Sequence, residues 1–192
     1  MRKRFAILFG FLCLGLLDSV LAYGIPLNFE YTGFSILWHW YLIGLLVFTR
    51  DKPILLRFLI GSLAGLAYGM LFSGSLFYNW IMFVLLSVLI GFFKPVMNTF
   101  GKQFGIYFLF IIAFDLLSYV FMQMRYPVQI SFFDWLYRME LISLFTTAFC
   151  IGCVMFMDNV MVRFFLIQRH LERKQEKKMM RRMQARKTTE YL

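Results

Sequence analysis

Six apolar stretches, separated by short polar breaks, make up most of the chain. Each is 17 to 19 residues long, close to the roughly 20 residues that an α-helix needs to cross a bilayer. Only 16% of the residues are charged, whereas a soluble domain has about 25%. We therefore expect an all-α, polytopic membrane protein with about six transmembrane helices, over residues 5–23, 33–49, 54–72, 76–93, 104–122 and 139–157.

Two parts are expected: a six-helix transmembrane domain, residues 1–158, and a basic C-terminal tail, residues 159–192, which reads as a helix. The first span could instead be a secretory signal cleaved after Ala22. Its length and the acid Asp18 favour a retained span, and either outcome leaves the following residues outside.

The lysines and arginines fall almost entirely on one side of these spans. Of the 20 in the chain, only Arg125 and Arg138 lie in connections on the other side. The rest precede the first span, follow every second span or lie in the tail. Basic residues near span ends stay on the cytoplasmic side of a membrane, so both termini are expected to be cytoplasmic.

Three polar side chains, Asp18, His39 and Asp115, lie inside predicted spans, where an ionisable group is costly and commonly functional. Asp115 is about 11 residues into its span, or roughly 16 Å deep, near the midplane. A structural polar contact, partner binding and proton transport stay open for it. Asp18 and His39 lie at similar depths on consecutive spans, which predicts a contact between them. The alternative is that each faces interfacial water.

The third span carries small residues at four-residue spacing, which places them on one face of a helix. Such a face lets two helix backbones approach closely in lipid. Packing within this chain is one interpretation, and docking of a partner's membrane helix is the other. The stripe consists of Gly61, Gly65, Gly69 and Ser73.

Catalytic and metal-binding signatures are missing from the sequence, including H-E-x-x-H, G-x-S-x-G and a phosphate-cradling glycine-rich loop. Cys150 and Cys153 have C-x-x-C spacing but lie mid-span, away from the cations or histidine that activate a thiol. We therefore expect no enzyme activity, no cofactor and no metal site.

Half of the basic residues follow the last apolar stretch. Their nearest polyanion is the layer of lipid headgroups, so nucleic acid is not expected as a partner. Each basic group near an anionic leaflet contributes about 1 kcal/mol to binding. Contact with a cytoplasmic protein is the alternative. The residues are Arg163, Arg169, Arg173, Lys174, Lys177, Lys178, Arg181, Arg182, Arg186 and Lys187.

The order of these features resembles the rod shape-determining protein MreD family over nearly the whole chain. The matching features are a basic start, an acid in the first span (Asp18), a glycine-rich third span, an acid near an aromatic residue in the fifth span (Asp115 and Tyr119), and a basic end. One position departs from the family. Members often have an acid directly after the aromatic residue of the third span, where this chain has Gly69, so no role of that acid carries over.

The resemblance implies a non-enzymatic subunit of the machinery for bacterial cell elongation and peptidoglycan synthesis, located in the plasma membrane. It further implies a scaffold that associates with MreC, a membrane-anchored protein with a large outer domain. A second hypothesis is the vitamin-binding subunit of an energy-coupling-factor transporter, which is also a small six-helix protein. Such subunits usually carry an Ala-x-x-x-Ala face on the first span, and here Ala6 and Ala22 are too far apart to form one.

Overall fold

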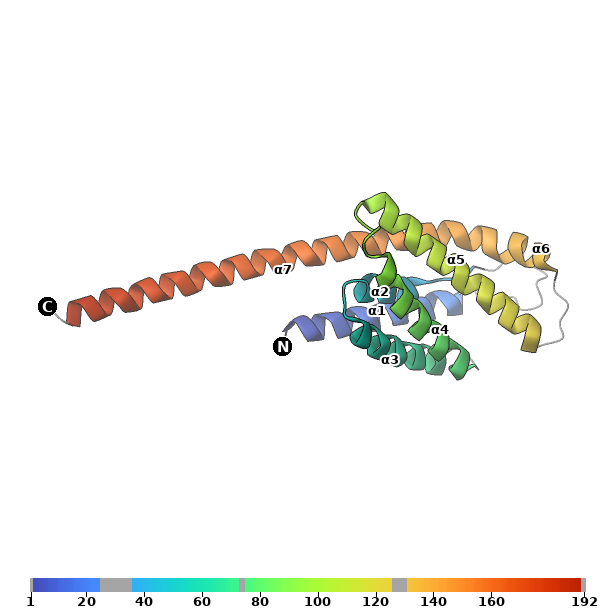
Figure 1. The fold of residues 1–192 in the computed structure, drawn as a ribbon, viewed down its shortest axis with the longest axis horizontal. Coiled ribbons are helices and arrows are strands. Elements are labelled where there is room, and N and C mark those ends of the chain that lie inside the picture. The colour runs from blue at the N-terminus through green and yellow to red at the C-terminus, as the bar shows by residue number, and fades with distance from the viewer. Residues whose placement is uncertain (1, 25–35, 73–74, 126–130, 191–192) are drawn as a thin grey trace. The chain divides into compact units, whose positions relative to one another are not determined.

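The computed structural model describes residues 2–24, 36–72, 75–125 and 131–190 (Figure 1). Ser73 lies outside these ranges. Among the basic residues of the tail, the side chains of Arg163 and Arg173 are described, and both are exposed. The chain divides into two units, Met1–Val154 and Met155–Leu192, so the division falls slightly before the boundary expected at residue 158.

All regular structure in the described residues is helical. Two elements depart from α geometry: η1 is a 3₁₀-helix and η2 is a π-helix. In chain order the elements are α1 (Arg2–Gly24), α2 (Trp40–Thr49), α3 (Ile54–Phe72), α4 (Leu76–Leu89), η1 (Ile90–Phe93), α5 (Phe100–Arg125), α6 (Phe132–Trp135), η2 (Leu136–Glu140) and α7 (Leu141–Glu190).

Four helical segments of the described chain are long and apolar enough to cross a membrane. They are Ile54–Leu71, Leu76–Phe93, Phe100–Arg125 and Phe132–Gln168. The apolar parts Phe9–Gly24 of α1 and Trp40–Thr49 of α2 are shorter. The described residues are therefore helical, as expected from the sequence, and four of their helical segments have the length and apolar composition of a membrane span.

The second predicted span differs most from the observed element. Its helix begins only at Trp40, and residues 36–39 before it are not helical. At 1.5 Å per residue, α2 is about 15 Å long, roughly half of the hydrocarbon core. The apolar run of residues 33–49 is continuous in sequence, and its hydropathy does not reveal a helix that starts midway.

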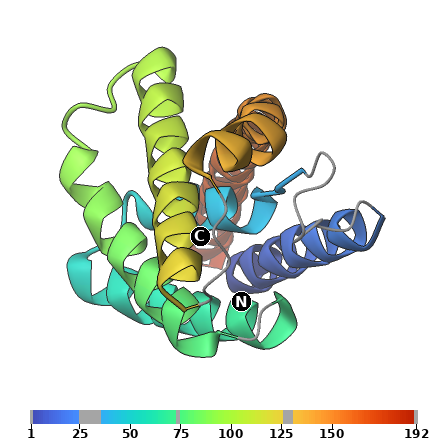
Figure 2. The ribbon, with the colours of Figure 1, turned by 90° about the vertical axis from the view of Figure 1, so that its right-hand side faces the viewer.

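The short helix α2 lies in the middle of the Met1–Val154 unit (Figure 2). Residues 42–47 are all buried, so every face of the helix is covered. A helix that is apolar all round must be buried in this way. Gly44 faces the side chain of Leu14 on α1, and Tyr41 contacts Phe83 on α4.

Helices α3 and α4 form a tight antiparallel pair through the glycine face of α3. A Cβ atom at Gly65 would lie 2.9 Å from the Cα atom of Trp80, and one at Gly69 would lie 3.1 Å from the Cα atom of Leu76. A Cβ at Gly61 would meet the side chain of Ser87. The small-residue face is thus occupied by a helix of the same chain, where close backbone contact provides the main attraction in lipid.

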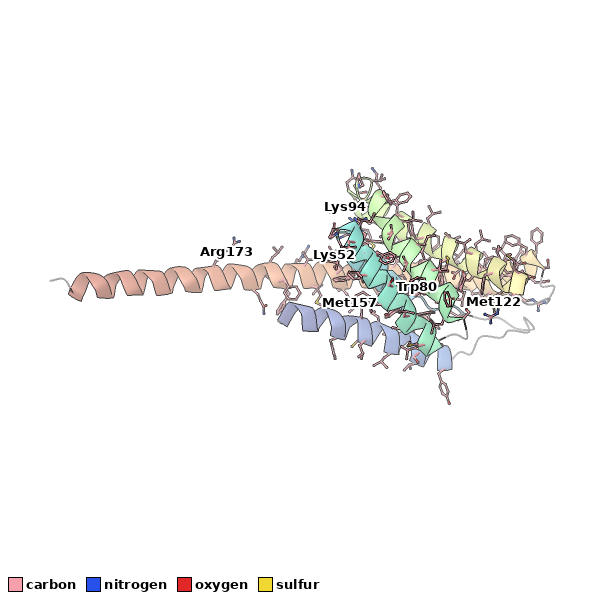
Figure 3. The ribbon with its side chains drawn as sticks, turned by 60° about the horizontal axis from the view of Figure 1, so that its bottom comes forward. Lys52, Trp80, Lys94, Met122, Met157 and Arg173 are labelled. Carbon is pink, nitrogen blue, oxygen red and sulfur yellow. The ribbon has the colours of Figure 1, made fainter. Side chains whose placement is uncertain are left out.

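Polar contacts join the turn after α2 to the start of α5 at one end of this unit, which we call the basic end (residues 50–53 and 94–103). Lys94 Nζ lies 2.9 Å from Asp51 Oδ1, and Arg50 donates a hydrogen bond to Gln103 Oε1 at 3.2 Å. Burial alone raises the pKa of Asp51, but the hydrogen bond from Lys94 and the charge of Arg50 outweigh it and hold the pKa below its usual range. Figure 3 shows Lys52 beside Lys94 and the labelled Met122 of α5 at the other end.

Helix α7 runs without interruption from Leu141 to Glu190. The predicted sixth span and the predicted helical tail are therefore parts of one helix. In the Met155–Leu192 unit, exposed apolar side chains, among them Phe156, Phe164 and Ile167, continue past the predicted end of the span at residue 157.

Candidate functional site: the interrupted helix at the centre of the bundle

The break before α2 leaves backbone N–H groups at the helix start that no earlier turn can bind. Asp18, on α1, accepts hydrogen bonds from the backbone N–H groups of Trp40 at 3.1 Å and Tyr41 at 2.9 Å. One carboxylate thus caps α2 from a neighbouring helix, at the end where the helix dipole favours negative charge. Asp18 is only 4% exposed, which fits a group whose polar atoms are bound inside the protein.

Hydroxyl groups on α7 bind the non-helical segment just before α2. The backbone N–H of Leu37 donates to Ser143 Oγ at 2.9 Å, and Thr146 Oγ1 donates to the carbonyl of Leu37 at 3.3 Å. At membrane depth, non-helical backbone is tolerated only where protein or water satisfies it. Side chains of α7 thus provide that satisfaction from more than 100 residues away in sequence.

His39 joins three elements at the start of α2. Its Nε2 atom lies 2.9 Å from Asp115 Oδ1 on α5, and its Nδ1 atom lies 3.0 Å from Thr147 Oγ1 on α7. His39 and Asp115 are each 4% exposed. The pair therefore ties α5 and α7 to the segment before α2.

Asp18 and His39 interact electrostatically, but each of them makes its hydrogen bonds with other groups. Asp18 binds the backbone beyond His39, whereas the imidazole points to Asp115. The reason is that the helix of the second predicted span is interrupted. Because residues 36–39 are not helical, the N–H groups at the start of α2 compete for the Asp18 carboxylate, and the histidine pairs with the acid of α5.

Glu140 is a further acid at this site, and the sequence reasoning did not select it. It ends the π-helical turn η2, is 2% exposed, and neither carboxylate oxygen has a hydrogen-bond partner within the described part of the chain. It interacts electrostatically with both Asp115 and His39. A signal was present in the sequence, since the spacing of Glu140, Ser143 and Thr147 puts them on one helical face.

Aromatic rings from α2, α3, α4 and α5 pack beside this polar group. Tyr41 stacks on Tyr68 with ring centroids 5.9 Å apart, and Tyr68 lies 4.9 Å from Phe83. Phe114 packs edge-on against His39 at 6.4 Å. The rings form an apolar wall beside the buried acids.

The remaining candidate residues lie away from this arrangement or join it only by packing. Cys150 is buried and Cys153 is half-buried, and both are free thiols. Among the described residues, no group of three or more histidine, cysteine, aspartate or glutamate side chains has a geometry that could hold a metal ion. The polar atoms at the site instead join α1, α5 and α7 to the start of α2.

Comparison with known proteins adds no relative to this description. No protein-family model, no curated protein and no solved structure matches the chain.

Proposed function

We propose that this chain is a non-enzymatic subunit of the bacterial cell-elongation machinery and acts in the plasma membrane as a scaffold for an MreC-like, membrane-anchored protein. The observation that carries the proposal is the way the fold uses the residues that resemble the MreD family. Asp18 caps α2, Asp115 binds His39, and the glycines of α3 pack against α4. All of them hold helices together, as a rigid platform requires.

The surface available to a partner is then the outer, apolar side of the bundle. Leu55, Leu59 and Leu63 follow one another at four-residue spacing on α3 and are exposed, and Phe145 on α7 is exposed as well. Side chains four apart lie on one face of a helix. A partner's membrane helix can pack there without entering the core.

We propose six crossings, with both termini on the cytoplasmic side. In this arrangement α1 makes the first crossing, and residues 36–49 contribute to the second inside the bundle. The short α2 is compatible with a crossing because the backbone before it is bound by Ser143 and Thr146. Support for the orientation comes from the basic end, where the turn after α2 meets Lys94. The basic tail is proposed to bind anionic headgroups of the cytoplasmic leaflet.

Photo-crosslinking in a rod-shaped bacterium tests the scaffold. A photoreactive amino acid is placed at Leu63 or Phe145, which are exposed, and at Phe83, which is fully buried, as a matched control. We expect crosslinks to an MreC-like protein from the exposed positions and none from the control. Recovery of transporter ATPases without any cell-wall protein would overturn the proposal.

A vitamin-binding transport subunit is the second candidate, and one observation favours it. Glu140 places two unpartnered carboxylate oxygens next to a buried histidine in the interior, and interrupted helices bind substrate or ions in many transporters. Mass spectrometry of the purified protein decides this point. A vitamin bound at one molecule per chain would select the transport function.

A further inference from the structure

Three buried carboxyl groups lie around His39, and two of them have a hydrogen-bond donor or a positively charged partner. Asp115 faces the imidazole of His39, and Asp18 faces two N–H groups at the positive end of α2. Glu140 has no donor and no cation of its own among the described residues. An ionised Glu140 would add an uncompensated negative charge to the interior of a membrane protein, which is strongly unfavourable.

We propose that the interior of this protein contains a proton-binding site, in which Glu140 carries an exchangeable proton and the His39–Asp115 pair fixes its surroundings. The proton makes the carboxyl group neutral and removes the uncompensated charge. The inference does not depend on the proposed scaffold, because it rests only on the surroundings of one side chain.

The position of Glu140 in the chain supports an exchangeable rather than a permanent proton. It ends the π-helical turn between α6 and α7, and π-helical turns occur frequently at functional sites. One turn earlier, Tyr137 and Arg138 are exposed. The carboxyl group is thus buried at the end of a turn whose earlier residues are exposed, so the site lies close to the protein surface along the chain.

Ionisable groups face this site from every element packed around it. Asp115 and His39 act on Glu140 directly, and Asp18 acts on His39. Both nitrogens of His39 are already engaged, by Asp115 and Thr147. A proton that leaves Glu140 therefore goes to water, and the carboxyl group becomes a carboxylate. Among the described residues, further ionisable groups interact with Asp18 or Asp115: Tyr68 on α3, Tyr78 on α4 and Cys150 on α7.

Infrared spectroscopy of the full-length protein in lipid nanodiscs tests the site, because a protonated carboxyl group has a C=O stretching band that a carboxylate lacks. The wild-type protein is expected to show this band at neutral pH and to lose it on titration to alkaline pH. Labelling all glutamates with ¹³C is expected to shift the band to lower frequency. The label assigns the band to glutamate without any substitution.

Variants then assign the band to one residue. Glu140→Gln keeps the shape of the neutral side chain and is expected to abolish the band, whereas Asp134→Asn, an exposed acid on α6, is the matched control and is expected to retain it. A wild-type protein without the band at neutral pH, a band that the glutamate label does not move, or a band that persists in Glu140→Gln would each overturn the proposal.

Discussion

At the scale of single residues, the carboxylate of Asp18, on α1, caps the N-terminus of a different helix, α2. Asp18 binds two consecutive N–H groups at the start of α2. The alternative acceptor, water, is scarce inside a membrane bundle, so these N–H groups depend on Asp18. The conformation of the central helix therefore depends on a side chain of α1.

Replacing Asp18 by alanine is expected to lower the free energy of unfolding by about 2 kcal/mol, since a cap is lost and buried N–H groups remain unsatisfied. Asp18→Asn keeps one acceptor oxygen and is expected to lose less. Unfolding of the purified variants in mixed micelles, followed by helical circular dichroism, measures both values. Equal stability of Asp18→Ala and the wild type would contradict the capping role.

A double-mutant cycle tests the pairing of His39 with Asp115. His39→Gln and Asp115→Asn are expected to be coupled by about 1 kcal/mol or more, because the two side chains contact each other directly. A cycle between Asp18→Asn and His39→Gln serves as the control and is expected to give a smaller coupling. The reverse order would favour the contact predicted from sequence over the one in the structure.

At the scale of secondary structure elements, the packing of α3 on α4 depends on the absence of side chains. The Cα atom of Trp80 and the carbonyl oxygen of Asn79 lie within 3.0 Å of the position that a Cβ would take at Gly65. Both belong to backbone, which cannot move aside as a flexible side chain can. The two helices approach this closely only because the position is glycine.

Gly65→Ala is expected to destabilise the protein by about 1–3 kcal/mol through overpacking against α4. Gly105→Ala on α5 is the matched control, because nothing lies within 4 Å of its Cβ position. The control is expected to be neutral or slightly stabilising, since alanine favours helix more than glycine does. Thermal unfolding in the same detergent compares the two. Similar effects of both substitutions would show that α3 and α4 do not pack through this face.

Sequence and structure agree best where a single helix is long and apolar. Helix α3 starts at Ile54 and ends at Phe72, which is the range expected from hydropathy, because a helix that meets lipid must be apolar along its whole length. The start of α2 at Trp40 was not predictable in the same way. It depends on Ser143, Thr146 and Asp18, which are distant in sequence, and only three-dimensional contacts reveal that they replace a helical turn.

The same reasoning explains the candidate site. Asp18, His39 and Asp115 stand out in sequence because they are polar inside apolar runs, and all three are buried at the start of α2. Their hydrogen-bond partners depend on the interruption of the helix in the second predicted span, and the sequence did not indicate that His39 pairs with Asp115 or that Asp18 binds the backbone of α2. Glu140 lies at the edge of its apolar run, where a polar residue is ordinary, and only its spacing from Ser143 and Thr147 indicates that it shares their buried face.

At the scale of the whole molecule, basic side chains are more numerous at one end of the Met1–Val154 unit than at the other. Arg50, Lys52 and Lys94 lie at the basic end, whereas Arg125 ends α5 at the opposite end. A reporter fused after Leu192 tests the proposed orientation. Alkaline phosphatase, which is active only outside the cytoplasm, is expected to be inactive there, and green fluorescent protein is expected to be fluorescent. Active phosphatase would contradict the topology.

The dependence of α2 on distant partners also has a consequence for synthesis. A helix of 10 residues is too short to cross a bilayer by itself. The hydroxyl groups that bind the backbone before it belong to residues 143 and 146. The ribosome delivers those residues about 100 positions later. In the proposed six-span arrangement, the second segment therefore enters the membrane before its hydrogen-bond partners exist, and the interior is completed only when the start of α7 has been made.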